Sequence, residues 1–264
     1  MSRSRNPSPT PQHLNTATPE NKVQRAAISS GIDPSALPVH IAMIMDGNGR
    51  WATSRGLGRL LGHREGYRTL REVLLNCSEL GIRYLTVYAF SAENWARPKD
   101  EISGLFSLIE RAARDELRVM HKNNVRVRVA GRMEDLPVGL RQALADGVET
   151  TKGNTGITFT LAVNYGGRAE VVDAIKEIVR KGLEPDKVTE ELLAQHLYNP
   201  GHPDPDLMIR TAGEMRWSNF LLWQSAYTEL YVTETTWPDF KLEHLLEAVK
   251  TYQQRVRKFG AVVP

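Results

Sequence analysis

The sequence predicts a single α/β domain built on a mainly parallel six-stranded sheet with helices on both faces. Short apolar runs of strand length alternate with longer segments whose apolar residues recur at helical spacing. This alternation is typical of strand–helix–strand units, which produce parallel sheets. Of the 264 residues 41% are hydrophobic, which is enough for one large core, and we see no internal repeat.

Residues 1–35 are rich in Ser, Pro, Thr and Asn and poor in apolar residues. We interpret them as a disordered N-terminal tail with a helical turn around Val23–Ile28. The folded domain is therefore expected over residues 36–264.

The expected elements follow in chain order. Strands are predicted over residues 40–45, 84–90, 125–130, 157–163, 207–209 and 229–233. Helices are predicted over residues 64–80, 99–121, 137–151, 168–181, 188–197 and 241–259. The first of these helices stops at Gly81, and Pro137 occupies the first turn of the third. In helix 168–181 we expect four apolar residues to face the core, namely Val171, Val172, Ile175 and Val179.

The composition excludes several classes of protein. A net charge of +3 with a pI near 9.0 is too mild to indicate nucleic-acid binding, but it fits an anionic substrate or a visit to an anionic membrane surface. The single cysteine, Cys77, excludes an internal disulfide. Because we find no membrane-length apolar run and no secretory signal, we expect a cytoplasmic protein that meets any membrane peripherally.

The sharpest motif is Asp-Gly-Asn-Gly-Arg-Trp at residues 46–51, directly after the first predicted strand. Two glycines there predict a tight turn with exposed backbone N–H groups, and arginine is well shaped to hold phosphate oxygens. Asp46 supplies a carboxylate of the kind that holds a divalent cation. An ordinary Asn-Gly turn is the alternative interpretation. Arg59 and His63 follow, one helical turn apart on one face, and His63 taken alone is more often a helix-capping or partly buried histidine.

Two further segments carry similar side chains. Residues 90–98 place Ser91, Glu93, Asn94 and Arg97 in a strand-to-helix connection, where core packing and capping are the alternatives. Residues 210–220 contain Arg210, Arg216 and Ser218, and Glu214 offers an alternative in which the arginines form a structural ion-pair network. Glu229 begins the last predicted strand and is either a cation ligand or a solvated carboxylate.

Asp46, Ser91 and Arg210 each come immediately after a predicted strand. Ligands of parallel sheets bind beyond the carboxyl ends of the strands. We therefore expect the three segments to meet at one edge of the sheet and to form a site for one or two diphosphates.

Together these motifs resemble the cis-prenyltransferase family, that of bacterial undecaprenyl diphosphate synthase. The resemblance runs from about Pro38 to Phe240. It includes His-Ile-Ala-Met-Ile-Met-Asp-Gly-Asn-Gly-Arg-Trp-Ala, Phe-Ser-Ala-Glu-Asn-Trp-Ala-Arg-Pro and Arg-Thr-Ala-Gly-Glu-Met-Arg-Trp-Ser-Asn-Phe.

The resemblance implies Mg²⁺-dependent cis elongation of an allylic diphosphate, typically farnesyl diphosphate, by isopentenyl diphosphate. The product would be a polyprenyl diphosphate such as undecaprenyl diphosphate, which serves as a cell-wall lipid carrier. An apolar tunnel along helices 64–80 and 99–121 would receive the chain. The resemblance further implies a homodimer, with the region after Arg210 in the subunit contact, and no nucleic-acid partner.

The site residues implied by the resemblance fall into three groups. Asp46 and Asn94 would be catalytic, with Asn94 helping to remove a proton, and Asp46 and Glu229 would serve Mg²⁺. Isopentenyl diphosphate would be held by Arg210, Arg216 and Ser218. The full substrate-binding set is Gly47, Asn48, Gly49, Arg50, Trp51, Arg59, His63, Ser91, Ala92, Glu93, Trp95, Arg97, Arg210, Arg216, Trp217 and Ser218.

Two residues depart from the family pattern, because Met215 and Trp217 stand where a polar and a smaller apolar residue are common. Two alternative functions remain at this point. One is a non-catalytic partner subunit of a catalytic relative, and the other is a binder of phosphate ligands or nucleic acid. The presence of both the aspartate and the arginine pair argues against the first, and the dispersed charges argue against the second.

Overall fold

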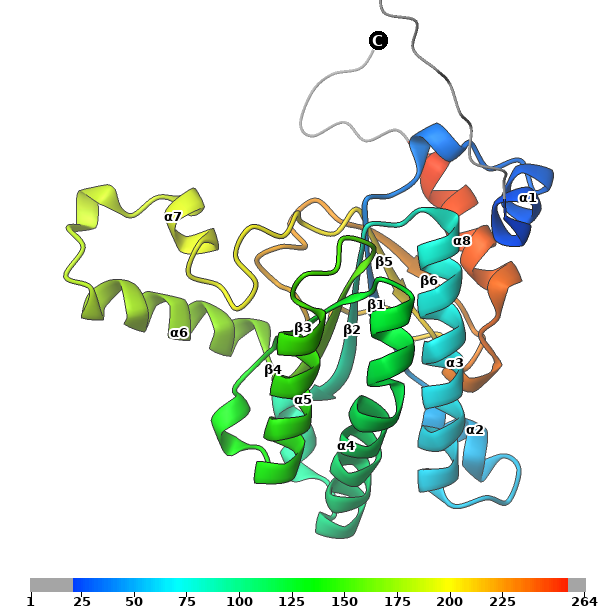
Figure 1. The fold of residues 1–264 in the computed structure, drawn as a ribbon, viewed down its shortest axis with the longest axis horizontal. Coiled ribbons are helices and arrows are strands. Elements are labelled where there is room, and N and C mark those ends of the chain that lie inside the picture. The colour runs from blue at the N-terminus through cyan, green and yellow to red at the C-terminus, as the bar shows by residue number, and fades with distance from the viewer. Residues whose placement is uncertain (1–20, 256–264) are drawn as a thin grey trace, which may run out of the picture.

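The structure is a computed structural model in which residues 21–255 are described (Figure 1). Its centre is a sheet of six parallel strands in the order β3-β4-β2-β1-β5-β6. The strands are β1 (His40–Ile44), β2 (Tyr84–Ser91), β3 (Arg126–Ala130), β4 (Thr158–Tyr165), β5 (Leu207–Arg210) and β6 (Glu229–Val232). The predicted six-stranded α/β domain is confirmed, and every strand begins within one residue of its predicted start.

The helices connect these strands. They are α1 (Lys22–Ser29), α2 (Asn48–Thr53), α3 (Arg59–Leu80), α4 (Lys99–Lys122), α5 (Val138–Thr151), α6 (Gly167–Arg180), α7 (Glu190–Ala194) and α8 (Leu242–Gln253). Among residues 21–255, no helix is both long enough and apolar enough to cross a membrane.

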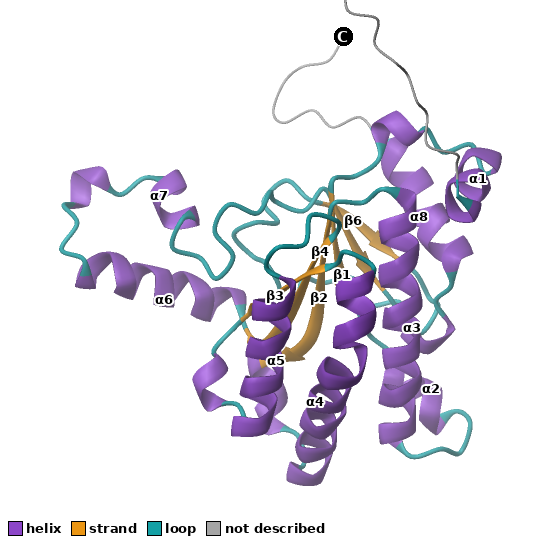
Figure 2. Ribbon diagram, viewed as in Figure 1, coloured by secondary structure: helices purple, strands orange, loops and turns teal. Residues whose placement is uncertain are grey.

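The two faces of the sheet are covered differently. Along β1, Ile41 and Met43 belong to a core formed with α1, α3 and α8, and α4 and α5 continue the same layer over β2 and β4 (Figure 2). Ala42 and Ile44 point to the opposite face, where Phe220 and Leu221 pack on them from an irregular segment. Alternation of side chains along each strand produces this division.

The predicted helical turn around Val23–Ile28 is confirmed, but its assignment to a disordered tail is wrong. Residues 22–29 form α1, which Asn21 caps by accepting a hydrogen bond from the Gln24 N–H, and Val23 and Ala27 are buried in the main core. The folded part therefore includes residues 21–35, because an amphipathic helix gains stability from burying its apolar face. Residues 1–20 of the predicted tail, like residues 256–259 of the predicted last helix, lie outside the described residues.

The predicted inward face of α6 is also wrong. Ala174 and Ile178 are buried, whereas Val172, Ile175 and Val179 are exposed. α6 projects from the body with α7 beside it and packs Ala174 and Ile178 against Leu193 of α7 (Figure 1). Periodicity identifies a stripe but does not show which stripe meets a neighbour.

Candidate active site

A polar cavity of about 560 Å³ opens at the carboxyl ends of β1, β2 and β5. All three arginine-bearing segments contribute to its wall, so the predicted convergence is confirmed. The predicted site residues that line it are Asp46, Asn48, His63, Ser91, Glu93, Asn94, Arg97, Arg210, Arg216 and Ser218.

Asp46 and Arg210 both line this cavity and contact each other. Arg210 Nη2 donates to Asp46 Oδ2 at 2.9 Å, and Nη1 donates to Ser218 Oγ at 2.7 Å and to the Arg216 carbonyl. The Arg210 side chain is 3% exposed and that of Asp46 is 36% exposed. A buried guanidinium thus holds the aspartate in place, while the outer part of the carboxylate faces the cavity.

Residues after Asp46 form a helix where the sequence predicted only a turn. Gly47 adopts φ +98° and precedes α2, and a Cβ at this position would lie 2.9 Å from Ala212 Cβ and from Thr236 Cβ. Only glycine fits this left-handed and crowded position. The first N–H groups of α2 are left without helical acceptors, and Arg59 lies over Gly49, where a Cβ would approach its guanidinium to 3.3 Å.

Glu101, which sequence reasoning missed, connects three predicted site residues. Its carboxylate lies 3.1 Å from Arg97 Nη1, 3.4 Å from Arg59 Nε and 3.8 Å from His63 Nε2. The Glu101 side chain is only 11% exposed. An available signal was its position in the first turn of the helix that follows Arg97, where an i,i+4 partner is expected.

His63 is neutral in this environment. Burial, followed by the positive charge of Arg97, lowers its pKa to about 4. Its Nε2 is buried and has no hydrogen-bond partner among residues 21–255. The imidazole therefore faces the cavity as a neutral group able to donate to or accept from a substrate oxygen.

The 90–98 segment shows both capping and cavity contacts. Ser91 and Asn94 form a capping box, in which the Ser91 N–H donates to Asn94 Oδ1 at 3.1 Å. The capping alternative for Ser91 is thus correct, although both residues also line the cavity. Glu93 accepts a hydrogen bond from Asn219 at 2.7 Å, which ties this segment to the third one.

Glu214 forms the predicted ion pair with Arg216 and a further one, which was not predicted, with Arg50 at 3.4 Å. The network interpretation is therefore correct for Arg216, whereas Arg210 pairs with Asp46. The side chains of Arg50 and Arg216 are 54% and 60% exposed, so the network lies at the rim and can exchange its carboxylate for another anion.

Several predicted residues do not line the polar cavity. Trp51 donates to Asp239 Oδ1 at 2.8 Å, and Trp95 donates to Asn164 Oδ1 at 2.8 Å within an aromatic cluster. Ala92 and Trp217 also lie outside the cavity wall, as do Gly47, Gly49, Arg50 and Arg59. Gly47 and Gly49 flank the wall residue Asn48 in the sequence.

Glu229 is not brought to Asp46 in this chain. It begins β6 opposite Leu207, at the amino end of the sheet, and accepts a hydrogen bond from Arg255 at 2.6 Å. The expectation that both carboxylates surround one metal ion is therefore wrong within the chain. Residues 21–255 contain no cluster of three or more His, Cys, Asp or Glu able to hold a metal ion. Asp46 alone still fits Mg²⁺, because this ion commonly takes one or two carboxylates together with substrate phosphates.

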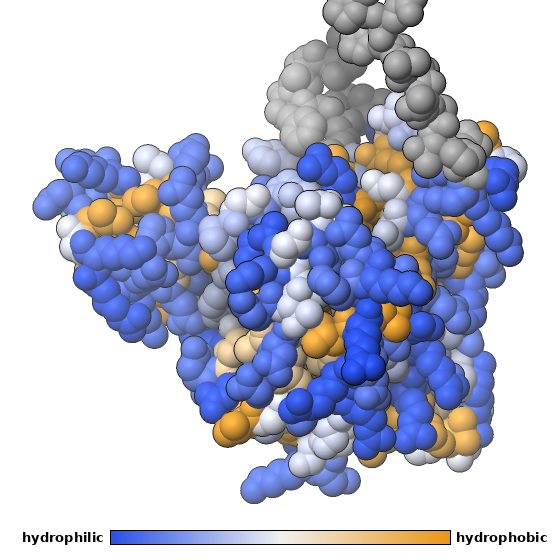
Figure 3. Space-filling model, in the orientation of Figure 1, coloured by the Kyte–Doolittle hydropathy of each residue, from blue (hydrophilic) through white to orange (hydrophobic). Residues whose placement is uncertain are grey.

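A second, apolar cavity of about 150 Å³ adjoins the polar one. The two share Met45, Asn48, His63, Ala89 and Leu105 as wall residues. From there the apolar cavity runs between α3, α4 and the sheet toward Val127 and Phe159, near the amino ends of β3 and β4. The space-filling view shows hydrophobic atoms between hydrophilic ones on the face formed by α3, α4 and α5 (Figure 3).

Comparisons with known proteins agree with this geometry. The family model described as putative undecaprenyl diphosphate synthase matches residues 44–260. An isoprenyl transferase of Heliobacterium mobile is 51% identical over 240 residues, covering 89% of this chain and 92% of the relative.

Two crystal structures share the fold at 36% identity. Lavandulyl diphosphate synthase from Lavandula x intermedia, in complex with dimethylallyl diphosphate, has a TM-score of 0.83 and covers 86% of this chain and 99% of its own. A probable undecaprenyl diphosphate synthase from Campylobacter jejuni has a TM-score of 0.72, with coverages of 84% and 98%. The chain is thus an enzyme rather than a non-catalytic partner, and it belongs to the undecaprenyl diphosphate synthase family of prenyltransferases.

Proposed function

We propose that this prenyltransferase performs Mg²⁺-dependent cis elongation, adding isopentenyl diphosphate units to an allylic diphosphate such as farnesyl diphosphate. The product would be a polyprenyl diphosphate, such as the undecaprenyl diphosphate used as a cell-wall lipid carrier. The observation that carries this proposal is the joining of a polar, arginine-lined cavity to an apolar one through shared walls. A substrate with a diphosphate head and a hydrocarbon tail would place its head in the polar cavity and its tail in the apolar one.

The two diphosphates would occupy different parts of the polar cavity. Arg216, Ser218 and the outer edge of Arg210 face one side and would hold isopentenyl diphosphate. The N–H groups at the start of α2, with Arg59 and His63, would hold the allylic diphosphate. This arrangement directs the allylic tail into the apolar cavity, whose wall includes His63.

The reaction requires an allylic C–O bond to break while a C–C bond forms to the isopentenyl double bond. Negative charge grows on the departing diphosphate, and the cationic and N–H donors on the allylic side would stabilise it more strongly than the ground state. When bound at Asp46, Mg²⁺ would supply further charge neutralisation. The two clamps would hold the reacting carbons together.

A proton must then leave the isopentenyl unit. Asn94 lines the cavity, and its Oδ1 already accepts a hydrogen bond from the Ser91 N–H. An amide is a weak base, so we propose that Asn94 orients a substrate phosphate oxygen or a water that takes the proton.

We also propose a homodimer that works at the inner face of the membrane, where a long polyprenyl product would be released. The exposed apolar stripe on α6 and the 79% exposed Met215 support a subunit contact. Light scattering of the purified chain would test the dimer, and a monomer at micromolar concentration would contradict it.

The function is tested by incubating the purified chain with farnesyl diphosphate, labelled isopentenyl diphosphate and Mg²⁺. Labelled polyprenyl products with cis double bonds are expected by chromatography against polyprenol standards and by NMR. Incorporation should stop when EDTA removes the metal. Products with trans double bonds, or undiminished incorporation in EDTA, would contradict the proposal.

A further inference from the structure

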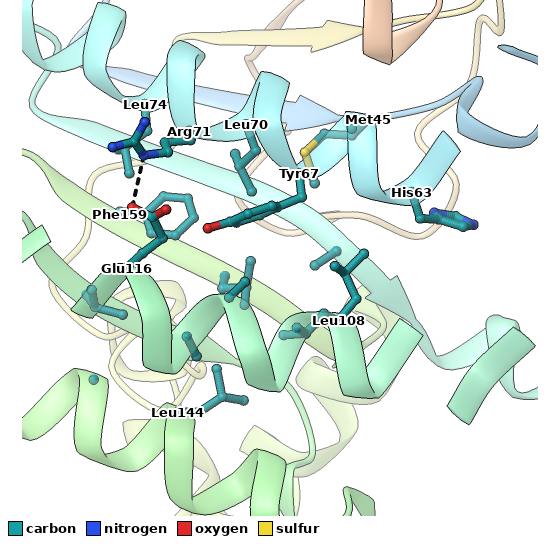
Figure 4. Close-up of a pocket in the computed structure, with 18 of the residues that line it drawn as sticks. Met45, His63, Tyr67, Leu70, Arg71, Leu74, Leu108, Glu116, Leu144 and Phe159 are labelled. Atoms are coloured by element: carbon teal, nitrogen blue, oxygen red, sulfur yellow. Dashed lines mark hydrogen bonds and ion pairs between the residues drawn. The ribbon is translucent and has the colours of Figure 1, made fainter. Parts of the chain in front are cut away.

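The apolar cavity contains one polar group of side chains in its deeper half. Arg71 Nε on α3 donates to Glu116 Oε2 on α4 at 3.0 Å, and the Tyr67 hydroxyl lies beside the same carboxylate. Figure 4 shows all three side chains directed into the space between the two helices, with His63 at the opposite end. The other wall residues near them, such as Leu70, Leu74 and Phe159, are hydrophobic.

The position of this pair along the cavity follows from helix geometry. His63, which borders both cavities, precedes Arg71 by eight residues on α3. At 1.5 Å per residue the pair lies about 12 Å from the diphosphate end. A tail that grows from the polar cavity therefore passes Leu70 before it reaches the pair.

The pair bridges two helices whose other side chains in the cavity wall are apolar, apart from His63 and Tyr67. The Glu116 side chain is 16% exposed and that of Arg71 is 48% exposed, so the contact spans from the cavity wall to the solvent. A prenyl tail pressed against it would remove water from both charges, and a tail passing between the helices would separate them. Either event costs free energy, because a desolvated or unpaired charge has no compensating partner in hydrocarbon.

We propose that the Arg71–Glu116 ion pair is a gate between α3 and α4 that limits the length of the product. It opposes extension of the tail beyond the deeper half of the cavity and thereby helps to set the length at which elongation stops. This inference rests on the proposed elongation function.

The test compares product lengths among three variants at equal total incorporation of label. Glu116→Gln keeps the shape of the side chain and removes its charge. Arg71→Met combined with Glu116→Leu replaces the pair by apolar groups of similar length, a change that buried ion pairs often tolerate. The matched control is Glu65→Leu with Arg68→Met, which removes an ion pair of 2.7 Å on α3 that does not line the cavity.

The gate predicts that the apolar double variant shifts the product distribution toward longer chains by one or more isoprene units. Glu116→Gln should shift it in the same direction, and the control should match the parent. Unchanged or shorter products from Glu116→Gln would overturn the proposal, even if the double variant does not fold. Failure of the parent to elongate at all would overturn the proposed function, and this proposal with it.

Discussion

Replacing Asp46 by alanine and by asparagine tests its structural role and its chemical role separately. Its carboxylate accepts hydrogen bonds from Arg210 Nη2 at 2.9 Å and from the Gly47 N–H at 3.0 Å. Asp46→Ala leaves the buried Arg210 guanidinium without this acceptor, and a hydrogen bond to a charged group contributes about 1.5–3 kcal/mol. Because Asp46 is 36% exposed, water replaces part of the contact, and we expect a loss of about 2 kcal/mol.

Asp46→Asn retains an oxygen for Arg210 but not the negative charge. We expect it to lose less than about 1 kcal/mol, the usual contribution of a neutral hydrogen bond. In a domain of this size the Ala variant should melt about 4–8 °C below the parent and the Asn variant within about 3 °C of it. Both should lose at least about a hundredfold in turnover, since each removes the carboxylate that we propose holds Mg²⁺ in the cavity.

The assays are thermal unfolding by circular dichroism and incorporation of labelled isopentenyl diphosphate. An Asn variant that keeps more than about a tenth of parental turnover would refute the metal role, because a lost electrostatic contact of this kind costs far more. Equal melting temperatures for the Ala variant and the parent would refute the claim that Asp46 satisfies the buried arginine.

Three further predictions follow from the same site. Gly47→Ala should lower the free energy of unfolding by about 1–3 kcal/mol, through its positive φ and its close contacts, whereas Gly153→Ala should not, since a Cβ there would meet no atom of residues 21–255 within 4 Å; chemical denaturation measures both. His63 has a pKa of about 4 in the folded state and 6.5 ordinarily, so the unfolded chain binds the extra proton. Stability should therefore fall as the pH drops from about 6.5 to 4, and denaturation across this range should show a smaller fall for His63→Gln; an identical fall would contradict the pKa. Glu101→Ala should raise the KM for the allylic diphosphate about tenfold by releasing two arginines, and steady-state kinetics should show no such change for the control Glu65→Ala, which removes a carboxylate outside both cavities.

Local chemistry explains why much of the fold could be predicted. Strands such as residues 84–90 are short apolar runs, and helices such as residues 99–121 carry an apolar stripe that ends at polar residues. These patterns depend on neighbours in the chain, so the six strands and most helices match the structure. The motifs after three strands could be expected to meet because parallel strands end at one edge.

Other features depend on contacts between residues that are remote in the chain. Glu101 became a candidate only when three cationic or imidazole side chains were found around it. The separation of Glu229 from Asp46 also depends on a remote contact, because the pairing of β6 with β5 places Glu229 at the amino end of the sheet.

The sequence by itself determined the parallel α/β fold, the three arginine-bearing segments and the resemblance to a prenyltransferase family. These properties follow from the periodicity of apolar residues and from motifs of adjacent residues. Only the tertiary structure decided that α1 belongs to the core, that α6 exposes its valines and that an ion pair crosses the apolar cavity. Each of these features depends on which surfaces pack together. Because the hydrophobic effect is non-directional, the local sequence does not show which surface an apolar stripe will pack against.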